Sequence, residues 1–296
     1  MASPTNIRAP RMGAGDLAGT AAAFELRIPS EAIRRLAIGW LALGIAALLG
    51  AGLFSILLVL ARTPAIAAHL PGVEFFRVAL VTHVDLSVLV WFASFAGVLW
   101  TIGGPANRTR VGWGALALAA IGTLAMAVAP FIGNGRPIMA NYIPVLDTPM
   151  FLGGLALFAI AFMAMAARAL VHTDGLEQSR QPLRIGLDAT ALAAIAAGIA
   201  LVWSWVGVPN DLPSVAYFEM LFWGPGHVLQ FVWTLVMLVA WVWLADRGGI
   251  GDALQSRMVA LAFVVALLPV LAVPIIYLAW PVTSIDAPKA VGRCFS

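Results

Sequence analysis

Seven long apolar stretches, separated by short segments rich in proline and glycine, dominate this chain of 296 residues. Each stretch is roughly 20 to 28 residues long, enough for an α-helix to cross a hydrocarbon core about 30 Å thick. A bilayer admits only structures that satisfy their own backbone hydrogen bonds, so such stretches predict transmembrane helices. We expect spans at 35–61, 76–102, 111–132, 149–171, 187–207, 217–245 and 256–281.

The composition supports the same fold class. Hydrophobic residues make up 62% of the chain and charged residues 10%, whereas a soluble domain is about half apolar and a quarter charged. We therefore predict an all-α protein, a polytopic membrane helical bundle of about seven transmembrane helices. The net charge of +3 comes largely from arginines in short loops, where positive charge sets membrane orientation. The expected partner is the lipid bilayer, with no nucleic acid.

The basic residues also predict the topology. Most of the 17 Lys and Arg residues lie at the N-terminus or at the ends of the second, fourth and sixth spans that share its side. By the positive-inside rule the N-terminus faces the cytoplasm and the C-terminus the opposite side. We expect a polar cytoplasmic segment at 1–34, a transmembrane domain at 35–281 and a short tail at 282–296. The expected location is a bacterial inner membrane, without a cleaved signal peptide.

Two histidines lie inside apolar spans. His83 is in the second span, and His227 is in the sixth, directly after the sequence Gly224-Pro225-Gly226. Both are expected about 10 to 15 Å below the non-cytoplasmic surface. A neutral imidazole offers a lone pair to a metal, so matched depth suits heme or metal ligation. The alternative is a hydrogen-bonded interior histidine in each case. The Gly-Pro-Gly segment predicts a break or kink, whose free space either admits a flat heme or serves helix packing alone.

The segment Arg77–Trp91 and the sequence WGPGHVLQF around His227 resemble the second and sixth helices of the catalytic subunit of the heme-copper oxidase and nitric oxide reductase superfamily. The resemblance implies that His83 ligates a low-spin heme and that His227 ligates copper or non-heme iron. It implies electron transfer from a cytochrome c or quinol donor to a site reducing dioxygen or nitric oxide, alongside other oxidase subunits. Arg77 and Arg136 would neutralise heme propionates, or are ordinary interfacial arginines.

The chain also departs from this family. Phe231 stands where many oxidases carry a tyrosine four positions after the histidine, and Gln230 cannot donate a proton as an acid would. The seventh span has no histidine, so the resemblance covers only the N-terminal half of a catalytic subunit. We expect a fragment, one part of a split subunit or a divergent relative. Two functions stay open: an oxidase-like respiratory subunit, and a non-catalytic membrane scaffold or assembly partner derived from the same fold.

Other polar residues have weaker interpretations. Asp85 follows His83 by two positions, and an acid at that depth must be protonated or paired. It belongs either to a proton path or to a structural hydrogen bond. His69 and His172 are expected in loops, and the single cysteine, Cys294, cannot form an intrachain disulfide.

Overall fold

The computed structural model of the chain describes residues 26, 30–67, 75–105, 108–132, 135–171, 181–250, 254–280 and 282. Within these residues, seven helices are long and apolar enough to cross a membrane. They confirm the predicted all-α membrane bundle, and each begins and ends within a few residues of its predicted span. The side of the membrane on which the N-terminus lies stays a prediction.

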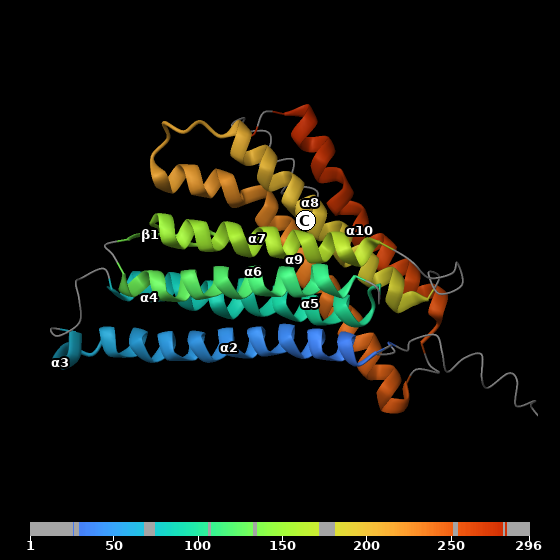
Figure 1. The fold of residues 1–296 in the computed structure, drawn as a ribbon. Coiled ribbons are helices and arrows are strands. Elements are labelled where there is room, and N and C mark those ends of the chain that lie inside the picture. Colours follow the sequence, from blue (N-terminus) through green and yellow to red (C-terminus); the bar gives the residue numbers. More distant parts are fainter. Residues whose placement is uncertain are drawn as a thin grey trace, which may run out of the picture.

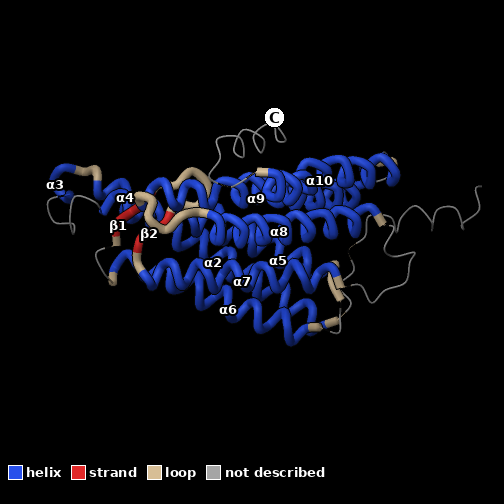
Figure 2. Tube along the Cα trace, turned by 90° about the horizontal axis from the view of Figure 1, so that it is seen from above, coloured by secondary structure: helices blue, strands red, loops and turns tan. Residues whose placement is uncertain are grey.

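The bundle is built from helices that run side by side (Figures 1 and 2). The second span is interrupted by a π-helical segment, η1, between α4 and α5. The helices are α2 (Glu31–Ala61), α3 (Pro64–Ala67), α4 (Phe75–Val84), η1 (Asp85–Val90), α5 (Trp91–Ile102), α6 (Thr109–Val128), η2 (Ala129–Phe131), α7 (Pro149–Leu170), α8 (Pro182–Gly207), α9 (Ser214–Ala245), η4 (Asp246–Ile250) and α10 (Ser256–Ala279).

A short β-hairpin joins α6 to α7 at the end of the bundle where α4 begins (Figure 2). Strands β1 (Arg136–Ile138) and β2 (Val145–Asp147) pair antiparallel, with Arg136 opposite Asp147. We call residues 139–144, between the strands, the hairpin loop. Both strands pack against α4, and β1 also contacts α9. The hairpin was not predicted from the sequence, because three-residue strands are too short to show a period.

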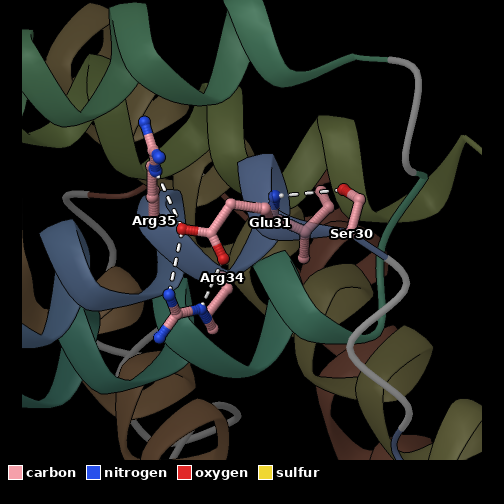
Figure 3. Close-up of polar contacts among 5 residues, drawn as sticks. Ser30, Glu31, Arg34 and Arg35 are labelled. Atoms are coloured by element: carbon pink, nitrogen blue, oxygen red, sulfur yellow. Dashed lines mark hydrogen bonds and ion pairs between the residues drawn. The ribbon is translucent and has the colours of Figure 1, made fainter.

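Helix starts follow ordinary capping chemistry. The hydroxyl of Ser30 accepts a hydrogen bond from the backbone N–H of Ile33 at 3.3 Å, which caps α2 (Figure 3). Glu31 in the first turn accepts hydrogen bonds from Arg34 and Arg35. The first helix therefore begins slightly before the predicted boundary at residue 35, because Ser30 supplies the acceptor that its free N–H groups require. Thr148 caps α7 in the same way.

Glycine allows close packing of α6 on α7. A Cβ atom on Gly122 would lie 2.5 Å from the Gly154 carbonyl oxygen, and one on Gly154 would lie 2.7 Å from the Gly122 carbonyl oxygen. Only glycine lets two backbones approach this closely. Membrane helices associate through such small residues, because the apolar surroundings supply little hydrophobic drive between them.

One of the arginines at the ends of the predicted spans is part of the core. Arg168, in the last turn of α7, is 2% exposed. Its guanidinium donates hydrogen bonds to the carbonyls of Arg108 at 3.1 Å, Pro105 at 2.8 Å and Trp100 at 3.4 Å. Arg184 of α8 donates to the neighbouring Gly103 carbonyl. These two residues therefore hold the end of α5 and the following turn, a role that their position near span ends did not predict.

Large apolar side chains cover the outside of the bundle. In α2 and α10 they occupy most of the outward positions, as expected where helices contact lipid rather than water. The described residues therefore support an integral membrane protein in contact with a bilayer. The exposed set includes Leu41, Ile45, Leu49, Leu53, Ile56 and Val59 in α2 and Met258, Leu261, Val265, Leu268, Leu271 and Ile275 in α10.

Candidate functional site

His83 is the last residue but one of α4 and is half-buried against α2. Its Nδ1 lies 2.9 Å from the carbonyl oxygen of Ala51 and 3.1 Å from the hydroxyl of Ser55. A carbonyl can only accept, so Nδ1 carries the proton and the lone pair lies on Nε2. Nε2 makes no hydrogen bond to any residue that the structure describes. Metal-binding histidines typically have this arrangement, in which one ring nitrogen is held by a carbonyl and the other is left to ligate.

The π-helical segment begins two residues after His83. Ser87 donates a hydrogen bond to the carbonyl of His83 at 2.7 Å. Such segments are rare and often accompany functional sites. The apolar pattern of the second span predicted a regular helix, since one residue of widening does not change a pattern of apolar side chains.

His227 has partners for both ring nitrogens. Its Nδ1 donates to the carbonyl of Trp223 at 2.7 Å, and its Nε2 lies 2.9 Å from the hydroxyl of Tyr142. Because Nδ1 carries the proton of the neutral ring, Nε2 accepts from the tyrosine. The Tyr142 and His227 ring centroids are 4.7 Å apart. The sequence predicted that position 231 supplies no tyrosine, because Phe231 follows His227 by one turn; the hairpin loop supplies one from elsewhere.

The glycines of the Gly-Pro-Gly segment provide space for two tyrosines. A Cβ on Gly226 would lie 2.3 Å from Cβ and Cγ of Tyr142, and a Cβ on Gly224 would lie 1.9 Å from the hydroxyl of Tyr277. The helix α9 continues through Pro225, so the chain does not break there, and the ribbon of α9 bends within the bundle (Figure 1). Side chains fill the space that was expected beside this backbone. This favours the interpretation in which the Gly-Pro-Gly segment serves helix packing rather than heme binding.

The hairpin loop is fixed to the start of α9 by an acidic residue. The Glu219 carboxylate accepts hydrogen bonds from the backbone N–H of Asn141 at 3.0 Å and from its side-chain amide. This places Tyr142 beside His227. Burial raises the pKa of the Tyr142 phenol above its usual value, and the negative charge of Glu219 raises it further. The phenol therefore stays protonated across the neutral range.

A cavity of about 250 Å³ separates η1 from α9 beneath the hairpin loop. Asp85 lies on one side, Gln230 and Trp233 of α9 lie on the other, and Asn141 and Tyr142 of the hairpin loop close one end. This cavity brings together the second span, the sixth span and the hairpin. Of the polar residues singled out in the sequence, Asp85 and Gln230 line this cavity, whereas His83 and His227 are not among its lining residues.

The two predicted arginines lie at the surface. Arg77 in α4 and Arg136 in β1 are both exposed, and packing of β1 on α4 places them on adjoining elements. Neutralisation of heme propionates by these residues stays a prediction. His69, His172 and Cys294 lie outside the described residues.

The two proposed cofactor positions differ in how well they fit. His83 fits a heme ligand, because its tautomer is fixed and Nε2 has no hydrogen-bond partner among the described residues. His227 does not fit a copper or iron ligand as it stands, because Tyr142 would have to move away from Nε2. Among the residues described, no group of three or more His, Cys, Asp or Glu side chains comes together to hold a metal ion.

Comparison with known proteins identifies relatives without describing their activity. The chain is 29% identical over 239 residues to an uncharacterized protein of Rickettsia prowazekii (strain Madrid E), a match covering 70% of this chain and 46% of that protein. It is 27% identical over 208 residues to an uncharacterized protein of Aquifex aeolicus (strain VF5), covering 53% of that protein. No protein-family model and no solved structure matches the chain. The chain therefore spans about half the length of the curated bacterial relatives it matches.

Proposed function

We propose that this chain is part of a heme-copper oxidase-like respiratory membrane subunit and that its own contribution is to hold a heme through His83. The observation that carries the proposal is the Nδ1 hydrogen bond to the Ala51 carbonyl, which leaves Nε2 as the ligating atom. The resemblance of Arg77–Trp91 to the second helix of that family also supports His83 as the heme ligand. A heme in this position supplies one-electron transfer between a cytochrome c or quinol donor and an acceptor site.

The residues around His83 would orient it and keep its lone pair available. The Ala51 carbonyl holds the proton on Nδ1, and Ser55 lies within hydrogen-bond distance of the same nitrogen. Withdrawal of the Nδ1 proton toward a carbonyl raises the basicity of Nε2, which strengthens ligation. Half-burial against α2 limits the access of water. Reduction of dioxygen or nitric oxide is proposed only for a complete subunit, and we derive no step through a metal at His227.

A specific observation favours a second candidate, a non-catalytic membrane scaffold or assembly partner of the same fold. Tyr142 and the Trp223 carbonyl use both nitrogens of His227, and two tyrosines fill the spaces beside Gly224 and Gly226. A histidine whose role is to pack helices together, rather than to bind a metal, would have this environment. The two candidates differ in heme content, so they are separated by one measurement.

The test is heme binding by the purified chain. We expect protein made in a heme-synthesising bacterium to carry stoichiometric heme by Soret absorption and pyridine hemochrome analysis. His83→Ala should lose the Soret band, whereas the control His172→Ala should keep it. Added imidazole should convert the wild-type spectrum to a low-spin form, since the described residues offer one ligand to this heme.

Size-exclusion chromatography and far-UV circular dichroism would establish that each variant is folded. Folded wild-type protein without a Soret band would refute the heme proposal and support the scaffold. Equal heme content in wild type and folded His83→Ala would show that heme is bound elsewhere.

A further inference from the structure

Four arginines gather at the end of the bundle where α2 and α6 begin. The two helices are in contact, since a Cβ on Gly112 would lie 2.4 Å from the Leu36 side chain and one on Gly39 would lie 2.5 Å from the Leu116 side chain. Both contacts run in the same chain direction with nearly the same offset, so the first turns of the two helices lie level with each other. These turns carry Arg34 and Arg35 of α2 and Arg108 and Arg110 of α6.

These arginines lie at the surface and outnumber the acids beside them. The side chains of Arg34 and Arg35 are 56% and 71% exposed, and Arg108 and Arg110 are exposed as well. Glu31 is the one acid in the sequences of α2 and α6. Its carboxylate lies between the guanidinium groups of Arg34 and Arg35 (Figure 3). One carboxylate among four guanidinium groups leaves a net charge of +3 at this surface.

The two arginines of α6 have no counter-charge among the residues that the structure describes. The backbone of Arg108 is held in place, because buried Arg168 donates a hydrogen bond to its carbonyl at 3.1 Å. The guanidinium groups of Arg108 and Arg110 themselves form no hydrogen bond or ion pair with a described residue. Asp188 of α8 is already paired with Arg184 at 3.4 Å. A guanidinium can donate two parallel hydrogen bonds to a phosphate, so this surface suits a phosphate-bearing anion.

The surface next to the arginines is apolar. Trp113, one turn after Arg110, is 45% exposed, and a Cβ on Gly39 would lie 3.6 Å from its ring. Ile38 and Leu41 of α2 are also exposed. Tryptophan is enriched where membrane helices meet the headgroup region. A ligand at this surface would contact cations at one end and apolar side chains at the other. An anionic phospholipid has both parts, whereas free phosphate has no apolar part.

We propose that Arg34, Arg35, Arg108, Arg110 and Trp113 bind an anionic phospholipid, whose phosphate lies at the arginines and whose acyl chains lie along the outward faces of α2 and α6. We call these five residues the lipid site. Its net positive charge favours lipids with a net negative charge over zwitterionic lipids. The proposal depends neither on heme at His83 nor on the side of the membrane that this end of the bundle faces, so it survives if the proposed function fails.

The test uses the full chain reconstituted in mixtures of phosphatidylglycerol, which is anionic, and phosphatidylcholine, which is zwitterionic, with brominated acyl chains on one lipid at a time. Bromine quenches tryptophan fluorescence on contact, so the difference between the wild type and Trp113→Phe isolates quenching at the lipid site. We expect phosphatidylglycerol to be preferred over phosphatidylcholine by about five-fold or more, the selectivity that one arginine gives near an anionic lipid. The preference should weaken as the NaCl concentration rises.

Two double variants separate the lipid site from the general charge of the protein. Arg108→Gln/Arg110→Gln should lower the preference for phosphatidylglycerol by about five-fold or more. The matched control Arg62→Gln/Arg257→Gln removes the same charge from two other exposed positions and should keep the wild-type preference. Each variant is measured with and without Trp113→Phe, and far-UV circular dichroism establishes that it is folded.

Three results would overturn the proposal. The first is equal quenching of Trp113 by the two brominated lipids in the wild type. The second is an equal loss of preference in the two double variants, which would mean that only the total charge of the protein attracts the lipid. The third is displacement of phosphatidylglycerol by sodium phosphate beyond the effect of NaCl at equal ionic strength, which would assign a site for a soluble anion. The first and third use the arginines of the wild type, so they apply even if a double variant does not fold.

Discussion

Replacement of Gly226 by alanine tests whether close packing of Tyr142 against α9 holds the tyrosine beside His227. The new Cβ would lie 2.3 Å from two atoms of Tyr142, whereas carbon atoms in contact are about 3.5 to 4.0 Å apart. The tyrosine must therefore move by about 1 Å or more. Tyr142 donates to His227 at 2.9 Å, so this movement also breaks the hydrogen bond.

The expected loss of stability follows from three contributions. Overpacking costs about 1–3 kcal/mol, and loss of the hydrogen bond to His227 costs about 0.5–1.5 kcal/mol. Alanine favours a helix interior over glycine by about 1 kcal/mol, which partly offsets both. We expect a net decrease of roughly 1–3 kcal/mol in the free energy of unfolding.

The assay is unfolding in mixed micelles of increasing SDS content, followed by far-UV circular dichroism. The matched control is Gly52→Ala in α2, where an added Cβ would have no neighbour within 4 Å and stability should be unchanged or slightly higher. Tyr142→Gly removes both obstructing atoms, Cβ and Cγ, so the double variant should be more stable than the two single effects predict. Equal stabilities for Gly226→Ala and Gly52→Ala, or additive effects in the double variant, would refute the reasoning.

Two other predictions concern the hydrogen-bonded ends of the bundle. Arg168→Ala should lower the free energy of unfolding by about 3 kcal/mol or more, because three carbonyls lose their hydrogen-bond donor. The control Arg110→Ala, at an exposed position, should have little effect in the same SDS titration. Equal effects of the two substitutions would contradict the buried role of Arg168. Glu219→Gln should bring the pKa of Tyr142 closer to its ordinary value, since the negative charge raises it. The measurement is the ultraviolet absorbance of tyrosinate as the pH rises, taken as the difference between each protein and its Tyr142→Phe counterpart. An unchanged titration of Tyr142 would mean that the charge of Glu219 does not affect its pKa.

The candidate site was predicted in part. The sequence singled out His83, His227, Asp85 and the Gly-Pro-Gly segment, since polar or helix-breaking residues within apolar spans are conspicuous. It did not identify Tyr142, because that residue lies in a loop, 85 positions from His227, and nothing in its neighbourhood marks it. A tyrosine was sought one turn from the histidine along the same helix, whereas the structure brings one from the hairpin.

The sequence likewise did not indicate which backbone carbonyls accept hydrogen bonds from the buried side chains. Ala51, which holds His83 through its carbonyl, is 32 positions away and contributes only backbone. Every residue but proline has the same backbone donor and acceptor, so a sequence does not indicate which carbonyl a side chain will reach. The same reason explains why the sequence did not connect Arg168 with the three carbonyls around it.

The amino-acid sequence alone determined that this protein is a membrane bundle, and where its spans begin and end. Those properties follow from hydrophobicity and length, which are local and additive along the chain. Only the tertiary structure decided that His227 is paired with Tyr142, that tyrosines fill the spaces beside Gly224 and Gly226, and that Asp85 lines a cavity with its Oδ2 lacking a hydrogen bond to any described residue. These depend on which side chains distant in sequence meet in space, and packing of helices fixes that through contacts no single segment contains.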